Sequence, residues 1–455
     1  LPGTCIPAVH KKSIADTSAL IAASRSLTVE LLGNAGGGFT VTNTLSFDRG
    51  DVFYLDQGDY ELPAGARQQK TDSLLGGKKT AVAGFAVPAL GSRAIAPAAK
   101  PAGAGASPFR FSGDTLETPF ALIRFAKNGT IASFLDKTAG NRELRGEGFP
   151  LGTLIMAEDV SLSWDNWDID ADIEYKFQDC SELLERKTVS DGAVEFRIRS
   201  KYRVSPKSTV EQDLVFYADS PLVLYETKID WHDQHRFLKA AFDTTVFAPE
   251  ARHEIQFGYI RRPAFRSTSL EKAKFEVTNH KYTDLSESRY GAAVLNDSKY
   301  GVSVQDSRIR LSLHKGGNRP DYTADEGLHE CRYAFLPHNG PFSAESVVRP
   351  AYLFNYLPVI TAGPREAGSL FRIDAPTVIA EAVKPCEDTQ RAYIVRLYEC
   401  EGATAAAALD IPGAKEITET NLLEEPAGEM AAGVRGGHVS LRFRPFEIKT
   451  LKVSY

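Results

Sequence analysis

The class of fold is decided by the stretch Val194-Glu195-Phe196-Arg197-Ile198-Arg199-Ser200-Lys201-Tyr202-Arg203-Val204. Apolar side chains alternate in it with charged or polar ones. Because successive side chains of a strand point to opposite faces of a sheet, this alternation predicts a half-buried strand. We expect its apolar face to pack in a core and its charged face to lie in solvent.

The same period of two recurs along the chain, and no helical periods separate the strands. Ile309, Leu311 and Leu313 alternate with polar residues, and residues 439–443 follow the same pattern. Between two further apolar runs, Asn128-Gly129 has the composition of a two-residue hairpin turn. Strands joined by short turns form antiparallel sheets, so we expect a mainly β protein built from several antiparallel β-sandwiches.

One helix is expected ahead of the strands, over residues 11–32. Leu20, Leu27 and Leu31 recur at spacings of seven and four residues, which places them on one side of a helix. The glycine-rich run after Leu32 should end it, because glycine and asparagine accept the left-handed conformation. The apolar stripe needs a partner, so we interpret the helix as the last part of a missing helical domain.

Breaks in the pattern divide the chain into five segments. Residues 97–108, rich in alanine, glycine and proline, have no side chains to build a core and are expected to form a linker. A softer break lies near Gly363-Pro364. The expected segments are a terminal helix at 1–32, a small β-sandwich at 33–96, the linker, a large β supersandwich at 109–375 and a C-terminal β domain at 376–455.

Composition and charge exclude several classes of protein. Of the 455 residues 43% are apolar, so the chain can bury a substantial core. Lys+Arg 53 against Asp+Glu 59 gives a net charge of -6, which argues against nucleic acid as a partner. No apolar run approaches the length of about 18 residues that a membrane-spanning helix needs, so we expect no membrane partner.

The cysteines indicate a reducing compartment. They are few and widely spaced, with no C-x-x-C pair, at Cys5, Cys180, Cys331, Cys386 and Cys400. A zinc site built on thiolates is therefore not expected. No signal peptide is visible at the start of the sequence. Free thiols and a cytoplasmic location are the prediction.

The densest polar and aromatic cluster is Trp164-Asp165-Asn166-Trp167-Asp168-Ile169-Asp170. Aromatic faces beside carboxylates suit a sugar, because its C–H face packs on rings while its hydroxyls need hydrogen-bond partners. The alternative is a loop that its tryptophans anchor and in which its aspartates make turns. Asp165 and Asp168 could supply a carboxylate pair, but one short loop seldom places two carboxylates on opposite sides of a sugar ring.

Two further motifs carry chemistry in principle. His232-Asp233-Gln234-His235 has the look of a metal site, but a hairpin turn between two strands is the favoured interpretation. Lys315-Gly316-Gly317-Asn318-Arg319-Pro320-Asp321 lacks the context of a phosphate-binding loop, and a sheet-edge loop offering Lys315 or Arg319 to a ligand is the hypothesis instead. The sequence contains no G-x-S-x-G, no H-E-x-x-H and no dinucleotide fingerprint.

Read end to end, the chain resembles the C-terminal half of glycoside hydrolase family 38, the retaining α-mannosidases. The cytosolic and vacuolar-type members are the most similar. The residues that carry the resemblance lie in the family's order: Asn43-Thr44-Leu45-Ser46-Phe47-Asp48-Arg49, Trp164-Asp165-Asn166-Trp167-Asp168-Ile169, Gln256-Phe257-Gly258, Leu295-Asn296-Asp297-Ser298-Lys299-Tyr300-Gly301, Asp325-x-Gly327-x-His329-Glu330 and Tyr333-Ala334-Phe335-Leu336-Pro337-His338. The large β unit also resembles mutarotase-type supersandwiches.

The resemblance implies that the catalytic residues and zinc lie in an N-terminal α/β barrel whose motifs this sequence lacks. The chain itself would then carry no catalytic residue, metal site or cofactor. It would pack on the missing catalytic barrel and complete the cleft for a mannoside or other carbohydrate. By position, the residues implied to bind substrate are Trp164, Asp165, Trp167, Asp168 and Lys315, where Lys315 stands for the usual arginine.

Two alternatives stay open on the residues alone. The chain could be a stand-alone carbohydrate-binding module, which would bind a mannoside without the barrel. It could also be an epimerase-like sandwich that uses a His/Glu pair, which would require both groups within reach of one sugar.

Overall fold

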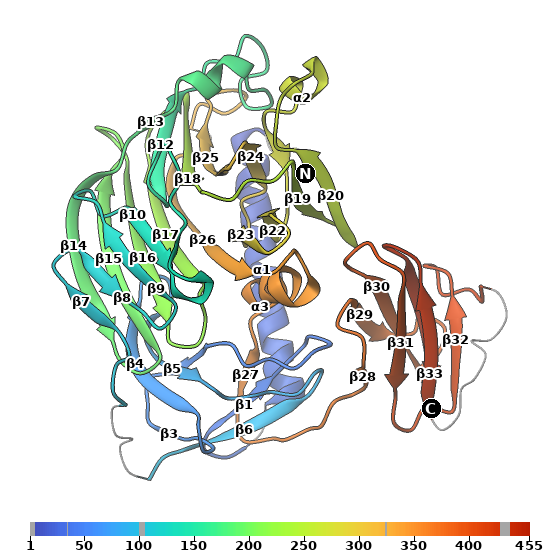
Figure 1. Ribbon diagram of the computed structural model, residues 1–455. Coiled ribbons are helices and arrows are strands. Elements are labelled where there is room, and N and C mark those ends of the chain that lie inside the picture. Colours follow the sequence, from blue (N-terminus) through green and yellow to red (C-terminus); the bar gives the residue numbers. More distant parts are fainter. Residues whose placement is uncertain (1–4, 34, 100–104, 324, 428–436) are drawn as a thin grey trace.

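The computed structural model describes residues 5–33, 35–99, 105–323, 325–427 and 437–455. It is built from antiparallel sheets, and one long helix precedes them in the chain, which confirms the predicted fold class (Figure 1). Part of the predicted linker, residues 100–104, lies outside the described residues.

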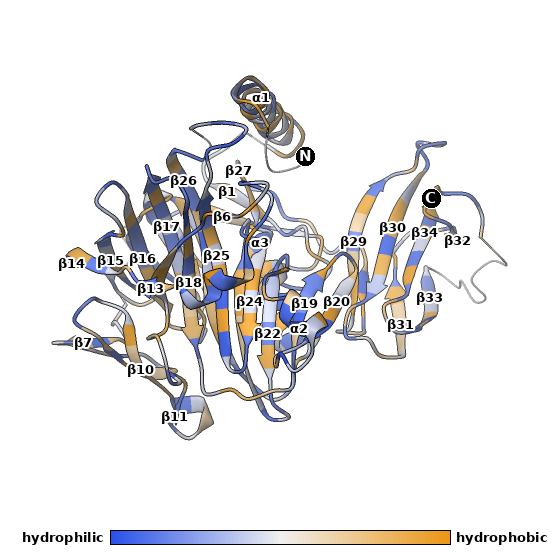
Figure 2. Cartoon of the chain, turned by 90° about the horizontal axis from the view of Figure 1, so that it is seen from above, coloured by the Kyte–Doolittle hydropathy of each residue, from blue (hydrophilic) through white to orange (hydrophobic). Residues whose placement is uncertain are grey.

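The long helix, α1 (Pro7–Leu32), begins earlier than predicted because Pro7 suits the first helical position. It ends at the predicted residue for a different reason. Gly33 is extended rather than left-handed, at φ -65°, and its N–H still donates to the carbonyl of Val29 at 2.8 Å. None of the α1 residues is buried, and Leu20 and Leu31 are 67% and 65% exposed. Figure 2 shows the helix standing beside the sheets rather than between them.

Two sheets form the body of the molecule. The nine-stranded sheet consists, in spatial order, of β14 (Glu182–Asp191), β15 (Glu195–Arg203), β16 (Thr209–Tyr217), β17 (Val223–Trp231), β26 (Gly327–Asn339), β23 (Tyr290–Asn296), β22 (Tyr282–Ser286), β19 (Glu250–Ile255) and β20 (Gly258–Pro263). The six-stranded sheet consists of β13 (Gln178–Asp179), β12 (Thr153–Glu158), β18 (Arg236–Asp243), β25 (Arg308–Gly316), β24 (Gly301–Gln305) and β21 (Val277–Thr278).

Smaller sheets and short helices surround this body. The five-stranded sheet has β11 (Arg142–Glu143), β10 (Ile131–Asp136), β9 (Ala121–Phe125), β8 (Thr115–Glu117) and β7 (Arg110–Ser112). The short helices are η1 (Lys137–Ala139), η2 (Ala171–Tyr175), α2 (Ser269–Ala273), η3 (Ala344–Val348) and α3 (Arg349–Asn355). The hairpin at Asn128-Gly129 is present between β9 and β10, but the last backbone hydrogen bond before the turn joins Ala126 and Thr130. Its loop therefore has three residues, with Gly129 left-handed at φ 81°.

The N-terminal β unit contains two small sheets. One has β2 (Phe53–Asp56), β5 (Gly77–Ala83) and β4 (Arg67–Ser73), and the other has β27 (Val359–Ala362), β1 (Phe39–Thr42), β6 (Ser92–Pro97) and β3 (Tyr60–Glu61). Strand β27 comes from the stretch that the sequence assigned to the large unit, yet it pairs with β1. The chain thus returns to its first β unit before it enters the C-terminal sandwich.

The C-terminal sandwich has two sheets around a core that includes Val395, Leu409 and Leu451. Its sheets are β28 (Arg372–Ile373), β31 (Ala405–Asp410) and β33 (His438–Phe443), and β29 (Val378–Pro385), β30 (Ala392–Glu399), β34 (Ile448–Ser454) and β32 (Glu416–Thr420). Phe446 packs edge-on against Tyr259 of β20, with ring centroids 5.0 Å apart. This contact joins the sandwich to the nine-stranded sheet.

The largest core is formed by the nine-stranded, six-stranded and five-stranded sheets together. Tyr225 of β17 stacks on Tyr333 of β26 at 4.9 Å, and Phe242 of β18 stacks on Phe335 of β26 at 5.3 Å. Phe242 of the six-stranded sheet packs on both Tyr225 and Phe335 of the nine-stranded sheet and thereby joins the two sheets. The connection 232–235 between β17 and β18 therefore crosses from one sheet to the other, and the hairpin turn predicted there is wrong, because β17 and β18 pair with different neighbours.

Strand β15 confirms the predicted strand but not its predicted exposure. Phe196 and Ile198 face the large core as expected. Glu195 and Arg197 are buried as well, because the hairpin of β4 and β5 covers their side of the sheet. Tyr54 Oη donates to Glu195 Oε2 at 2.7 Å, and Gln69 Nε2 donates to the carbonyl of Glu195 at 2.9 Å. Polar groups of the N-terminal unit thus replace the water expected there.

Arg197 is the centre of this buried network. Its Nε lies 3.1 Å from Glu195, and its NH1 lies 3.0 Å from Asp213 and 2.7 Å from Glu226. Ser73 Oγ on β4 donates to Glu226 Oε2 at 2.7 Å, so the network spans both units. Burial of such a charge is tolerable only when it is paired and hydrogen-bonded.

We predict that Arg197→Met lowers the free energy of unfolding by about 3–5 kcal/mol, because it leaves buried carboxylates without their counterion. Arg203→Met is the matched control on the same strand. Its ion pair with Glu182 is half exposed, so a loss of about 0–1 kcal/mol is expected. Urea denaturation followed by circular dichroism measures both, and equal losses would contradict this role for Arg197.

Candidate functional site

Two loops meet at one edge of the six-stranded sheet and form the candidate site. The first loop, residues 159–170, follows β12, and the second, residues 317–326 with residue 324 outside the described part, follows β25. Asp165 Oδ2 accepts hydrogen bonds from the backbone N–H groups of Asn318 at 2.7 Å and Arg319 at 3.1 Å. Asn166 Nδ2 donates to the carbonyl of Arg319 at 2.8 Å. The two loops are therefore fastened to each other.

Two histidines hold the far end of the second loop. His314 Nε2 and His329 Nε2 both donate to the carbonyl of Asp325, at 3.0 and 2.8 Å. Their rings are 4.3 Å apart. Burial lowers the pKa of His314 to about 3, and burial also lowers the pKa of His329, so both rings are neutral near pH 7. Two neutral donors on one carbonyl fix the loop without burying a charge.

The joined loops enclose an open pocket of about 840 Å³. Its lining combines two tryptophans and a tyrosine with amide, imidazole and guanidinium groups: Ser161, Leu162, Ser163, Trp164, Asp165, Asn166, Trp167, His235, Asn318, Arg319, Pro320 and Tyr322. Such a mixture of aromatic faces and a few polar groups suits a sugar.

The tryptophans form an exposed aromatic surface. Trp164 and Trp167 have ring centroids 6.0 Å apart and planes 22° apart, and their side chains are 69% and 64% exposed. Trp164 has the left-handed φ of 61°, and its carbonyl accepts from the N–H of Trp167 at 2.6 Å. The tight turn thus holds the two rings side by side instead of burying them in a core.

The structure brings together three of the five residues expected to bind substrate. Trp164, Asp165 and Trp167 line the pocket, whereas Asp168 and Lys315 are absent from its lining. Asp168 Oδ1 accepts from the N–H of Ile169 at 2.9 Å, within the loop. Lys315 Nζ is bonded to Asp159 and donates to the carbonyl of Asp168 at 2.8 Å. Lys315 therefore secures the first loop from beneath.

Asp165 is also engaged by protein. Besides its two backbone bonds, its Oδ1 lies 3.3 Å from His235 Nδ1. A carboxylate held on both oxygens serves to build a pocket and is a poor nucleophile. The arrangement therefore supports binding, not the two opposed carboxyl groups that glycoside hydrolysis requires.

His235, Asn318 and Tyr322 are pocket residues that the sequence did not single out as substrate-binding. His235 belongs to the motif considered for metal, and Arg319 was named only as an alternative to Lys315. One signal could have found His235. It immediately precedes β18, and β18 pairs with β12, whose last residue leads into the first loop.

The described residues do not fit a zinc site. No group of three or more His, Cys, Asp or Glu side chains among them is arranged to hold a metal. The two histidines of the 232–235 connection have separate partners, since His232 Nε2 lies 2.9 Å from Asp230 and His235 contacts Asp165. No metal-dependent step is therefore assigned to this part of the chain.

Asp159 is the buried charge beneath the first loop. Burial raises the pKa of its carboxyl, and the ammonium of Lys315 opposes this rise. When the pKa of a carboxyl is higher in the folded protein than in the unfolded chain, ionisation of that carboxyl lowers the stability of the fold. The loss begins as the pH rises above the unfolded pKa, which is near 4, and it is complete above the folded pKa. Lys315 keeps this loss small.

We predict that Lys315→Met destabilises the protein by up to about 3 kcal/mol at pH 7 and that the loss shrinks as pH falls toward 4, because Asp159 then becomes neutral. Lys315→Arg is the control and should retain stability at both pH values. Urea denaturation at several pH values measures the effect. A loss that is independent of pH would contradict the pairing with Asp159.

Comparisons with known proteins agree with this geometry. The glycosyl hydrolases family 38 C-terminal domain matches residues 116–323, and the family 38 C-terminal beta sandwich domain matches residues 377–451. A crystal structure of an alpha-mannosidase from Enterococcus faecalis has the same fold, with a TM-score of 0.74 and 15% identity over 98% of this chain and 60% of that one.

Curated relatives share more of the sequence. Human Alpha-mannosidase 2C1 is 34% identical over 350 residues, covering 74% of this chain and 33% of its own length. Alpha-mannosidase G of Dictyostelium discoideum is 34% identical over 360 residues, covering 75% and 32%. The chain thus spans about a third of the length of the curated relatives it matches. On the two matched domains, the chain belongs to glycosyl hydrolase family 38, as its C-terminal region.

Proposed function

We propose that this chain is the β region of an α-mannosidase and that it completes the cleft for a mannoside beside an N-terminal catalytic barrel. The observation that carries the proposal is the pocket that Trp164 and Trp167 form with Arg319 and His235. The relatives of this chain are named α-mannosidases, which supports α-mannosidic bonds as the target of the whole enzyme. Hydrolysis with retention is included in the proposal because the resemblance of the sequence implies it. In this proposal, the zinc site lies in the barrel and not in this chain.

Exposed apolar side chains around the pocket support the docking of a further domain. Leu162 is 92% exposed and Tyr322 is 69% exposed, beside the two exposed tryptophans. Apolar side chains gathered at one edge in this way mark an interaction surface. We infer that the catalytic barrel covers this edge and leaves the aromatic faces in its cleft.

In the proposed role, the pocket residues bind and orient the sugar. The tryptophan rings offer faces to the C–H groups of a pyranose, and Arg319 and Asn318 offer donors to its hydroxyls. Asp165 fixes the backbone of the second loop, and Lys315 fixes that of the first. Asp168 and Lys315 would then act on substrate only through the position of the loop.

Hydrolysis of a chromogenic α-mannoside tests whether catalysis belongs to the barrel and not to this chain. The chain alone should show no turnover, with or without added zinc, because Asp165 is already bonded to protein and no opposed acid lies in the described pocket. Clear turnover by the pure chain would overturn the proposal and place an active site in the β region.

The contribution of the pocket is tested in the enzyme that includes the barrel. We predict that Trp164→Ala lowers kcat/KM for an α-mannoside about tenfold, which corresponds to roughly 1.4 kcal/mol of lost sugar contact. Tyr175→Ala is the control, since Tyr175 is 91% exposed and lies outside the pocket lining. If Trp164→Ala and the wild type have the same kcat/KM, the tryptophans do not contact the substrate in the cleft.

A stand-alone carbohydrate-binding module is the second candidate. It is favoured by the aromatic surface that this chain presents by itself, since Trp164 and Trp167 are 69% and 64% exposed. Calorimetry with a mannobiose separates the two roles. Saturable binding that Trp164→Ala weakens supports a module, whereas absence of heat at millimolar sugar removes it.

A cytoplasmic location is proposed as well. All five cysteines are free, and burial raises the pKa of the Cys180 and Cys331 thiols to about 12. Such thiols stay protonated and inert in a reducing compartment. Cell fractionation would test this, and recovery in a secreted fraction would contradict it. No helix among the described residues is long and apolar enough to cross a membrane.

A further inference from the structure

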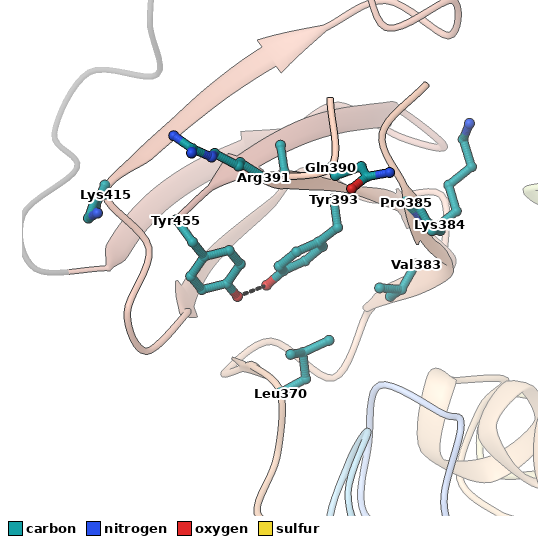
Figure 3. A pocket seen from close by; sticks show the side chains of 10 residues that line it. Leu370, Val383, Lys384, Pro385, Gln390, Arg391, Tyr393, Lys415 and Tyr455 are labelled. Carbon is teal, nitrogen blue, oxygen red and sulfur yellow. Dashed lines mark hydrogen bonds between the residues drawn. The ribbon is translucent and has the colours of Figure 1, made fainter. Parts of the chain in front are cut away.

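A second pocket lies in the C-terminal sandwich, in a different part of the fold from the tryptophan pocket (Figure 3). Its volume is about 680 Å³. It is lined by Leu370, Val383, Lys384, Pro385, Gln390, Arg391, Ala392, Tyr393, Lys415 and Tyr455. Neither the proposed mannosidase function nor the contacts of the sandwich with the nine-stranded sheet use these residues.

Two tyrosines form an aromatic wall of this pocket. Tyr393 of β30 and Tyr455, which follows β34, stack with ring centroids 5.4 Å apart. Tyr455 Oη donates to Tyr393 Oη at 2.8 Å, as Figure 3 shows. Tyr455 is 42% exposed and Leu370 nearby is 41% exposed. The pocket thus offers an apolar surface with two hydroxyl groups at its edge.

The backbone places one cation on each side of Tyr455. The N–H of Tyr455 donates to the carbonyl of Arg391 at 3.1 Å, and the N–H of Lys415 donates to the carbonyl of Ser454 at 2.9 Å. The end of β34 therefore lies between the residue that precedes β30 and the residue that precedes β32. Figure 3 shows Arg391 and Lys415 beside the aromatic pair.

Arg391 and Lys415 differ in their pairing from Lys384, the third cation of the lining. Within the described part of the chain, neither the Arg391 nor the Lys415 side chain has an ion pair or a hydrogen bond. Lys384 lines the same pocket but is paired with Glu387 at 3.0 Å and with Glu424. Burial raises the pKa of the Tyr393 phenol, so it stays neutral and adds no negative charge. Arg391 and Lys415 are therefore the cations of this lining that an anionic ligand can pair with.

We propose that this pocket binds a phosphorylated sugar, with the sugar against Tyr393 and Tyr455 and the phosphate on Arg391 and Lys415. Arginine and lysine both bind phosphate through charge-assisted hydrogen bonds. The phenol hydroxyls and the Gln390 amide supply both donors and acceptors, which suits sugar hydroxyls. This site goes beyond the proposed mannosidase function and does not depend on it.

Calorimetry on the full 455-residue chain tests the proposal with glucose 6-phosphate, because a glucose series avoids the mannosides proposed for the tryptophan pocket. Glucose 6-phosphate should bind saturably, and inorganic phosphate, glucose and adenosine monophosphate should each bind about tenfold more weakly or not at all. These three probes carry the anion alone, the sugar alone and the anion with an aromatic base.

The double variant Arg391→Ala with Lys415→Ala should weaken glucose 6-phosphate at least about tenfold. Both side chains are exposed, so the substitutions leave the core intact. Arg442→Ala is the matched control, an exposed cation on β33 of the other sheet, and should leave the affinity unchanged. Tyr455→Ala should weaken binding of the sugar phosphate but not of inorganic phosphate.

Four results would overturn the proposal. Absence of saturable heat up to tens of millimolar removes the site. If inorganic phosphate or glucose binds as tightly as glucose 6-phosphate, the ligand is not a phosphorylated sugar. If adenosine monophosphate binds more tightly than glucose 6-phosphate, the ligand is a nucleotide instead. An unchanged affinity in the double variant places the ligand elsewhere on the molecule.

Discussion

The buried Arg197 guanidinium and its carboxylate partners constrain the arrangement of the whole N-terminal two-thirds of the molecule. Glu195, Asp213 and Glu226 lie on three neighbouring strands of the nine-stranded sheet, and all bond to Arg197. Because burial removes the water that would solvate these charges, such a cluster is stable only when each charge is paired and the remaining polar atoms find partners. Tyr54 of β2 and Ser73 of β4 supply such partners, since Tyr54 donates to Glu195 and Ser73 donates to Glu226.

This network makes the first β unit and the nine-stranded sheet one body. The opposite side of β15 carries Phe196, which packs on Phe109 and on Phe111 of the five-stranded sheet, in the large core to which the six-stranded sheet also contributes. The position of β12 and β25 in that sheet then determines where their loops meet. The tryptophan pocket is thus supported by the six-stranded sheet, and this sheet packs in the same core as the nine-stranded sheet that contains Arg197.

The tryptophan pocket uses the same physical principle on a smaller scale. Its carboxylate, Asp165, is bonded to the second loop, and Lys315 beneath the first loop is paired with Asp159, so Arg319 is the charged lining group left for a ligand. Its aromatic groups are left exposed. The second pocket has two such cations, because neither the Arg391 nor the Lys415 side chain has a partner in the described chain, and its two tyrosines bond to each other. This difference is why we assign a neutral sugar to the first pocket and an anionic one to the second.

The sequence by itself determined the antiparallel β class and the family, because strand periods are local and the family motifs are contiguous. It also placed Trp164, Asp165 and Trp167 together, since they share one short loop. It could not predict that Glu195 and Arg197 are buried, because the hairpin that covers them comes from residues far away in the chain. For the same reason Lys315 looked free to bind a ligand. Only the tertiary structure showed Asp159 beneath it, and a buried carboxylate takes the nearest cation.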